Sequence, residues 1–158
     1  MATRLSTYLD NFALLSPAQF GFQRGKSTYM ALLEMQTCIS EAMNFNKYSL
    51  GVFFDISKAF DTVNHTLLIN KLEHYGIRGI AKQWFIDYLN NRKQYVSLKE
   101  VISSCMNITS GVPQGSILGP ILFLLYLNDL ANVSDILKLI MFDDDTNAFF
   151  SHNSLETL

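Results

Sequence analysis

Hydrophobic positions in the first third of the chain recur at helical spacing. Over residues 4–15 apolar side chains return every three or four positions, which predicts a short amphipathic helix that Pro17 ends. A second helix is expected to run to about Phe45, and Ser27 or Thr28 can cap its start. Its larger apolar side chains are expected in a core, namely Met30, Leu33, Met35, Ile39 and Met43.

Short apolar runs predict the strands. The run Tyr48–Phe54 shows little alternation, which is typical of a strand buried on both faces, and it ends abruptly in Asp55. Residues 136–142 and 148–150 are two apolar runs joined by a polar turn, as in a β-hairpin. Weaker alternation predicts two more antiparallel strands, at residues 95–98 and 101–109.

Three further helices are expected between these strands, over about 62–75, 79–90 and 117–130. Gly76 is the expected C-terminal stop of the first, and Pro120 is acceptable only in the first turn of the last. The first of the three should turn three leucines inward, namely Leu67, Leu68 and Leu72. Helices and largely antiparallel strands are mixed without βαβ regularity, so the predicted fold class is α+β.

Composition adds limits to this picture. At 158 residues, 49% of them hydrophobic, the chain has the length of one domain with an ample core. A net charge of −2 gives no overall nucleic-acid signature. Cys38 and Cys105 lie far apart in apolar surroundings, which suggests reduced core thiols in an intracellular protein of the nucleus or cytoplasm. The opening residues do not resemble a signal peptide, and the longest apolar run is too short to span a bilayer, so we expect neither secretion nor membrane insertion.

The candidate chemistry lies in the polar turn of the hairpin, where Asp143, Asp144 and Asp145 are consecutive. Three neighbouring carboxylates repel one another, and a bound Mg²⁺ is a common compensation because hard oxygen ligands suit it. A solvated acidic loop is the alternative. If the hairpin pairs with the strand that ends in Asp55, carboxylates from two strands converge at one edge of the sheet. That is the requirement of a two-metal phosphoryl-transfer site.

Five blocks of the sequence resemble, in order, the reverse transcriptases of non-LTR (LINE-type) retrotransposons, especially the jockey-like ones. They are QFGF at 19–22 with GKST at 25–28, FDISKAFD at 54–61, YLNNR at 88–92, GVPQGSILGP at 111–120 and FDDDT at 142–146. The resemblance implies a fingers and palm fragment of the right-hand polymerase fold, with a ferredoxin-like (split β-α-β) palm core and no thumb. Within this single truncated domain, fingers parts would cover about 1–48 and 66–110, and palm parts about 49–65 and 111–151.

The same resemblance implies an activity and roles for single residues. The activity is RNA-directed DNA polymerisation, a two-metal nucleotidyl transfer from a dNTP to a primer 3′-OH, with an RNA template and a DNA primer as partners. Asp55, Asp144 and Asp145 would be catalytic and, with the backbone carbonyl of Ile56, would hold two Mg²⁺ ions, for which Mn²⁺ could substitute. Phe60 would be the steric gate that rejects ribonucleotides. The other implied contacts are Gln114, Gly115, Arg24 and Lys26 to the nucleotide, and Arg92 and Lys93 to nucleic acid.

Three departures from the family pattern are visible. Asp143 stands where the family usually has a small residue, commonly alanine, and Gln23 stands where it often has an arginine. The chain stops at Leu158, so we expect a fragment of an element, without thumb or endonuclease. A catalytically inactive, truncated remnant that at most binds nucleic acid is therefore the alternative function.

Other interpretations compete at single motifs. Residues 21–28 imitate a P-loop, but a Walker A motif needs four residues between its glycines and this loop has three. Phe60 alone could be an ordinary core aromatic residue. Three histidines share no metal-ligand spacing and are expected at the surface or at helix caps, namely His65, His74 and His152. A solvated face is the alternative for the basic residues Arg92, Lys93 and Lys99.

Overall fold

The computed structural model describes residues 1–90 and 92–157, and the chain divides into two compact units. The first unit comprises Met1–Ser57 and Leu127–Leu158, and the second comprises Lys58–Tyr126. These boundaries differ from those of the fingers and palm parts, which stay a prediction. Asn91, which belongs to the third sequence block, lies outside the described residues.

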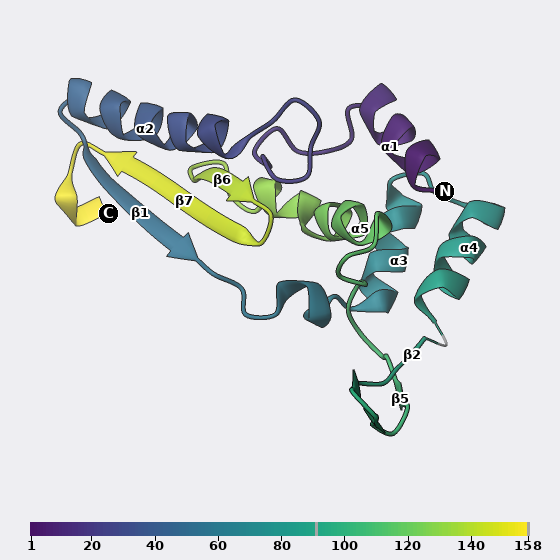
Figure 1. Cartoon of the computed structure of the whole chain (residues 1–158). Coiled ribbons are helices and arrows are strands. Elements are labelled where there is room, and N and C mark those ends of the chain that lie inside the picture. Colours follow the sequence, from purple (N-terminus) through teal and green to yellow (C-terminus); the bar gives the residue numbers. More distant parts are fainter. Residues whose placement is uncertain (91, 158) are drawn as a thin grey trace. The chain divides into compact units, whose positions relative to one another are not determined.

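The first unit is built around a three-stranded antiparallel sheet in the order β1-β7-β6 (Figure 1). The strands are β1 (Tyr48–Phe54), β6 (Lys138–Phe142) and β7 (Asp145–His152). The hairpin β6–β7 does pair with the strand that leads to Asp55, as expected, because β7 lies between the other two strands.

Strand β1 is an edge strand, and the prediction that it is buried on both faces is wrong. All seven of its residues are exposed, and Phe53 keeps 65% of its surface accessible. Within the described residues its only ladder partner is β7. A continuous apolar run shows that burial of the strand would be favourable, but it does not show that another element of the chain packs against it.

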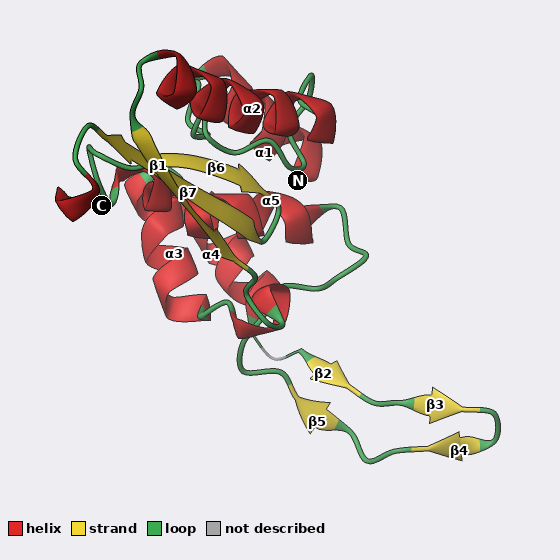
Figure 2. Ribbon diagram, turned by 90° about the vertical axis from the view of Figure 1, so that its left-hand side faces the viewer, coloured by secondary structure: helices red, strands yellow, loops and turns green. Residues whose placement is uncertain are grey.

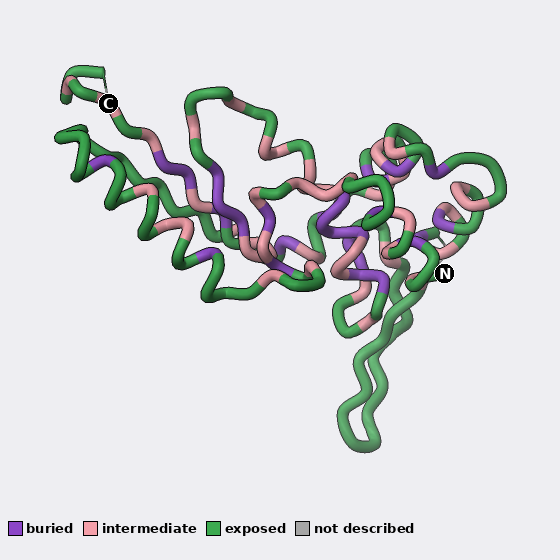
Figure 3. Tube along the Cα trace, turned by 90° about the horizontal axis from the view of Figure 1, so that it is seen from above, coloured by how far each residue is buried: buried purple, intermediate pink, exposed green. Residues whose placement is uncertain are grey.

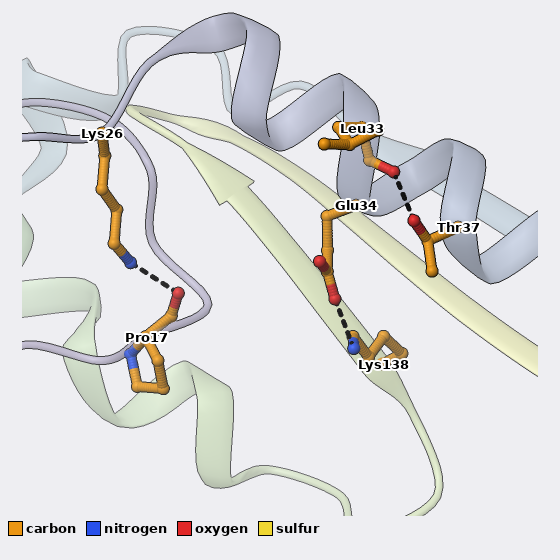
Figure 4. Close-up of polar contacts among 6 residues, drawn as sticks. All are labelled: Pro17, Lys26, Leu33, Glu34, Thr37 and Lys138. Atoms are coloured by element: carbon orange, nitrogen blue, oxygen red, sulfur yellow. Dashed lines mark hydrogen bonds and ion pairs between the residues drawn. The ribbon is translucent and has the colours of Figure 1, made fainter.

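Helix α2 (Thr28–Asn44) covers one face of this sheet (Figure 1). Ser27 caps it as predicted, since its side chain accepts a hydrogen bond from the Met30 amide. An ion pair of 2.5 Å between Lys138 of β6 and Glu34 ties the helix to the sheet, while Thr37 donates to the carbonyl of Leu33 within the helix (Figure 4). The buried cluster beneath the helix consists of Ala31, Ile140 and Phe149, with Phe20, Met35, Cys38 and Phe142 packed around it.

The side chains predicted to anchor α2 are mostly not the buried ones. Met35 packs on the core, but exposed positions are occupied by Met30, Leu33, Ile39 and Met43. The buried residues of the helix are Ala31 and Ala42, whose small size brings the helix backbone close to the sheet. The two cysteines are free; Cys38 is half-buried, and Cys105 is exposed, so the prediction that both are core thiols is wrong for Cys105.

Helix α1 (Ala2–Asn11) also belongs to the first unit and buries Leu5 and Leu9. It is shorter than the predicted 4–15 because Ala13 adopts a left-handed φ of 47°. The unit also contains the 3₁₀ helices η2 (Asn128–Asn132) and η3 (Leu155–Thr157). None of the helices in residues 1–90 and 92–157 has the length and apolar character that a membrane-spanning segment requires.

The second unit is a helical cluster of η1 (Ala59–Thr62), α3 (His65–His74), α4 (Gly79–Leu89) and most of α5 (Leu118–Leu127). Its fully buried side chains include Leu68, Leu72, Phe85, Leu122 and Phe123. Leu67, by contrast, is 51% exposed, so its predicted inward orientation is wrong. Gly76 follows the end of α3 with a left-handed φ of 86°, as a C-terminal stop requires.

A long hairpin arm leaves the helices of the second unit (Figure 2). It consists of β2 (Lys93–Gln94) paired with β5 (Met106–Asn107), and β3 (Ser97–Leu98) paired with β4 (Val101–Ile102). The antiparallel pairing was predicted, although the paired segments are shorter than expected. All residues of these four strands are exposed (Figure 3).

Candidate active site

The predicted catalytic aspartates lie at one end of the three-stranded sheet. Phe54, the last residue of β1, pairs with Thr146 of β7. Asp55 and Asp145 are therefore the next positions on two neighbouring antiparallel strands, and both are exposed. Opposite residues of such a pair have their Cβ atoms about 4.5–5.5 Å apart. Asp144 follows in the two-residue turn between Phe142 and Asp145, at the same end of the sheet.

The donor atoms at this end suit a hard divalent cation. Carboxylate oxygens are the ligands that Mg²⁺ takes in proteins, and Asp55 and Asp145 offer them to solvent. Ile56, the predicted carbonyl ligand, is half-buried directly after Asp55. Within residues 1–90 and 92–157, however, no group of three or more His, Cys, Asp or Glu side chains is already gathered as a metal would need. At least one of the three carboxylates would therefore have to move for all three to bind the same cation.

The additional aspartate of the turn, Asp143, points into the protein. Its φ of 56° is left-handed, a conformation that aspartate tolerates better than most residues. Its Oδ1 atom is buried against Gly21 and has no hydrogen-bond partner among the described residues. Burial raises the pKa of Asp143, and the neighbouring charges of Asp144 and Asp145 raise it further.

Gln19 holds the backbone of this turn. Its Nε2 donates to the carbonyl of Asp143 at 3.2 Å, and its Oε1 accepts from the amides of Asp143 at 3.2 Å and of Gly21 at 2.7 Å. Around Gln19 the backbone bonds to β6, because the Phe20 amide donates to Met141 and the Met141 amide donates to Ala18. Sequence reasoning assigned no role to Gln19; the only available signal was a polar side chain in the block QFGF.

The basic residues of this loop behave differently from one another. Lys26 Nζ donates to the carbonyls of Pro17 at 2.6 Å and Gln19 at 2.8 Å (Figure 4), and it lies 4.7 Å from the ring centroid of Phe20. Burial lowers the pKa of Lys26. Arg24 is exposed. Lys26 thus closes its own loop, and the nucleotide contacts of both residues stay predictions.

In the second unit, Phe60 and the loop 111–116 are joined. The ring of Phe60 stacks on Phe123 with centroids 4.2 Å apart, and its carbonyl accepts from the Val112 amide at 2.8 Å. The neighbouring Gly111 amide donates to Val63 at 2.8 Å. These contacts hold the residues that follow Asp55 in the chain against the loop that the resemblance assigns to the nucleotide.

The tip of that loop carries the predicted nucleotide contacts. Gln114 and Gly115 are both exposed, and Gln114 Nε2 lies 3.5 Å from an oxygen of Asp61. At the base of the loop, Ser110 Oγ donates to the Asp61 carbonyl at 3.0 Å. The side chain of Gln114 and the backbone of Gly115 are therefore accessible, and their contact with a nucleotide stays a prediction.

The predicted nucleic-acid contacts lie at the root of the hairpin arm. The guanidinium of Arg92 is 5.2 Å from the ring centroid of Tyr88, which stacks on Trp84 at 5.3 Å. Lys93 begins β2, and Lys99 lies in the turn between β3 and β4; both are exposed. A template contact and a solvated face both remain open for these residues.

Comparison with known proteins assigns the chain to a family. Residues 1–157 match the family described as "Reverse transcriptase (RNA-dependent DNA polymerase)", and the chain belongs to this family. It is 30% identical over 166 residues to the "Probable RNA-directed DNA polymerase from transposon BS" of Drosophila melanogaster, covering 97% of this chain. It is 35% identical over 130 residues, or 80% of this chain, to the "RNA-directed DNA polymerase from mobile element jockey" of the same species.

The matched regions are small parts of these relatives. This chain spans 18% of the transposon BS protein and 14% of the jockey protein. Among solved structures, a chain of a "Partial Cas6-RT-Cas1--Cas2 complex" is 25% identical, with 85% of this chain and 22% of that one covered. The TM-score of 0.39 is too low for an argument about the fold. The family match and these relatives together confirm the predicted resemblance to retrotransposon reverse transcriptases.

Proposed function

We propose that this chain is the part of a retrotransposon reverse transcriptase that carries the nucleotidyl-transfer site. The substrates would be an RNA template, a DNA primer and a dNTP. The observation that carries the proposal is the register of the sheet, which puts Asp55 and Asp145 side by side at the end where Asp144 forms the turn. Two exposed carboxylates, one directly after β1 and one at the start of β7, thus lie at the same end of the sheet.

In this proposal the aspartates hold the divalent cations. Asp55, Asp144 and Asp145 would hold them through side-chain oxygens, and Ile56 would add its backbone carbonyl. When bound, two Mg²⁺ ions, or Mn²⁺ in their place, activate the attacking 3′-hydroxyl and stabilise the leaving pyrophosphate. The contribution of the chain's own residues would be to place negative charge where the cations bind.

The remaining predicted residues would select and orient the substrates. Phe60 would fill the space beside the sugar 2′ carbon, with its stacking on Phe123 fixing the ring. The exposed Gln114 and Gly115 would lie against the incoming nucleotide. Other proposed contacts are Arg24 and Lys26 to the triphosphate, and Arg92 and Lys93 to the template backbone.

We also propose that the sheet β1-β7-β6 is the palm sheet of a right-hand polymerase, with the split β-α-β connection running from β1 through α5 to the hairpin. The element order along the chain supports this, because α5 is the last α-helix between β1 and β6. The fingers would include α1, α2 and the hairpin arm.

A second candidate function is a remnant that binds nucleic acid without catalysis. Asp143 favours it, because a third carboxylate beside the pair raises the local negative charge where a triphosphate would bind, and its burial leaves one oxygen unpartnered among the described residues. The Asp143→Ala substitution separates the polymerase from the non-catalytic remnant. It should restore activity only if the other residues of the site can still catalyse the reaction.

The direct test is a chimera in which residues 1–157 replace the matching segment of the jockey polymerase. RNA-templated primer extension with dNTPs and Mg²⁺ is expected, and Asp55→Asn or Asp145→Asn should reduce it at least a thousandfold. Extension that survives both substitutions would overturn the proposal. Binding of the template without extension, in the chimera and in its Asp143→Ala variant, would favour the remnant.

A further inference from the structure

Gln19 stands out as a buried polar residue whose contacts concentrate on one turn. The residue is only 3% exposed, although glutamine is usually a surface residue. The amide group engages both backbone polar atoms of Asp143, as a neighbouring strand would do. Asp143 lies beyond the last paired position, Phe142 with Asp145, so the hairpin ladder itself supplies no partner for these two groups.

Both the side chain and the backbone of Gln19 are held by neighbouring residues. The Gly21 amide donates to its Oε1 at 2.7 Å, while Lys26 Nζ and Gln23 Nε2 donate to its backbone carbonyl at 2.8 and 3.0 Å. A bridge with Met141 of β6 aligns its backbone with the sheet. Gln19 is therefore a rigid contact for the turn rather than an adaptable surface group.

We infer that Gln19 is a positioning residue for the candidate cation site, because its side-chain amide fixes the turn that presents Asp144 and Asp145. The inference rests on the proposed function and names one support of the same site. Groups that orient metal ligands from behind typically change metal affinity by about 10–100-fold when they are removed. The effect would travel through Asp143, since Gln19 bonds to its backbone and Asp144 follows directly.

Gln23 offers a matched control in the same loop. Its Nε2 donates to the carbonyls of Ser16 at 3.3 Å and Gln19 at 3.0 Å, so it also stabilises the loop through two hydrogen bonds. Those bonds involve no atom of the turn, and the Gln19 carbonyl that Gln23 contacts also accepts from Lys26 Nζ at 2.8 Å, so it keeps a donor when Gln23 is replaced. A general loss of loop stability should therefore follow from either substitution, whereas a loss of turn position should follow only from the Gln19 one.

The experiment compares Gln19→Met with Gln23→Met in the 158-residue chain. Free Mn²⁺ is measured by electron paramagnetic resonance during titration, with Asp145→Asn defining the affinity that belongs to the site. Amide hydrogen exchange of Asp143 is followed by NMR without metal. We expect Gln19→Met to weaken Mn²⁺ binding at least tenfold and to speed exchange of Asp143 about fivefold, as loss of one hydrogen bond would. Gln23→Met should change either value less than twofold.

The outcomes separate the inference from the proposed function. Equal Mn²⁺ affinity in the two methionine variants would overturn the positioning role while leaving the cation site intact. A wild-type chain that binds no Mn²⁺ through Asp145 would overturn the proposed function. In that case the hydrogen-exchange rate alone tests whether Gln19 fixes the turn. An exchange rate of the Asp143 amide that is the same in Gln19→Met as in the wild type would overturn the inference too. If Gln19→Met does not fold, Gln19→Asn, whose shorter side chain cannot span both backbone groups, provides the same comparison.

Discussion

Gly21→Ala is the sharpest test of how the turn is packed. Gly21 is buried, and a Cβ atom built on it would lie 1.9 Å from Asp143 Oδ1, 2.3 Å from Asp143 N and 2.8 Å from Asp143 Cγ. Its φ is outside the left-handed region, so the substitution is opposed by contact and not by backbone strain. The aspartate side chain could rotate, but its amide is held by Gln19.

The expected loss of stability follows from these contacts. Overpacking of this kind typically costs about 1–3 kcal/mol. Displacing the Gly21 amide from Gln19 Oε1 adds roughly 1 kcal/mol. Together the free energy of unfolding should fall by about 3 kcal/mol, which for a chain of this size corresponds to a Tm lower by about 6–12 °C.

A double-mutant cycle monitored by circular dichroism assigns the clash to Asp143. Asp143→Ala removes two of the three close atoms and should recover about 1 kcal/mol of the Gly21→Ala loss. The control is Gly25→Ala, where no described atom lies within 4 Å of the new Cβ and a left-handed φ of 77° costs about 1–2 kcal/mol. That cost should be the same in both backgrounds. A Gly21→Ala loss below about 0.5 kcal/mol, or one unaffected by Asp143→Ala, would refute the reasoning.

Two further predictions concern other parts of the chain. In the jockey chimera, Phe60→Val should raise incorporation of ribonucleotides relative to dNTPs about tenfold or more, as measured by primer extension; unchanged selectivity would mean that Phe60 has a structural role, such as its stacking on Phe123, and does not select the sugar. Lys138→Met should lower the free energy of unfolding by only about 0.5 kcal/mol at pH 7, because the pair with Glu34 is largely exposed. The hydrogen bond to Glu34 raises the pKa of Lys138, so the pair stabilises the fold at neutral pH and the difference in thermal stability should vanish as the pH rises through that pKa. A difference that persists or grows at high pH would contradict this.

Periodicity predicted the elements well because it depends on local geometry. The strand Tyr48–Phe54 and the cap at Ser27 follow from neighbouring residues alone, and the structure confirms both. The pairing of β7 with β1 was also within reach, since an apolar hairpin needs a partner strand. The predictions of burial were wrong at Phe53 and Met43, which are both exposed. An apolar side chain favours burial, but the sequence alone does not show which residues surround it.

For the candidate site too, some features could be predicted from the sequence and others could not. The residue types at Asp55, Asp144 and Asp145 pointed to cation chemistry, and the register places them at one end of the sheet. The contact of Gln19 with Asp143 could not be predicted, because it joins residues 124 positions apart through side-chain geometry. The inward position of Asp143 was likewise hidden, since it depends on the space left by Gly21.

The most direct test of the central claim is Mn²⁺ binding by the 158-residue chain and three asparagine variants. Asp55→Asn and Asp145→Asn each remove a proposed ligand, whereas Asp135→Asn removes an exposed carboxylate just before β6, at the opposite end of that strand from the turn. The account predicts at least a tenfold loss of affinity, measured by electron paramagnetic resonance, for the first two variants and no change for the third. Wild-type affinity in Asp55→Asn, or an equal loss in Asp135→Asn, would contradict it.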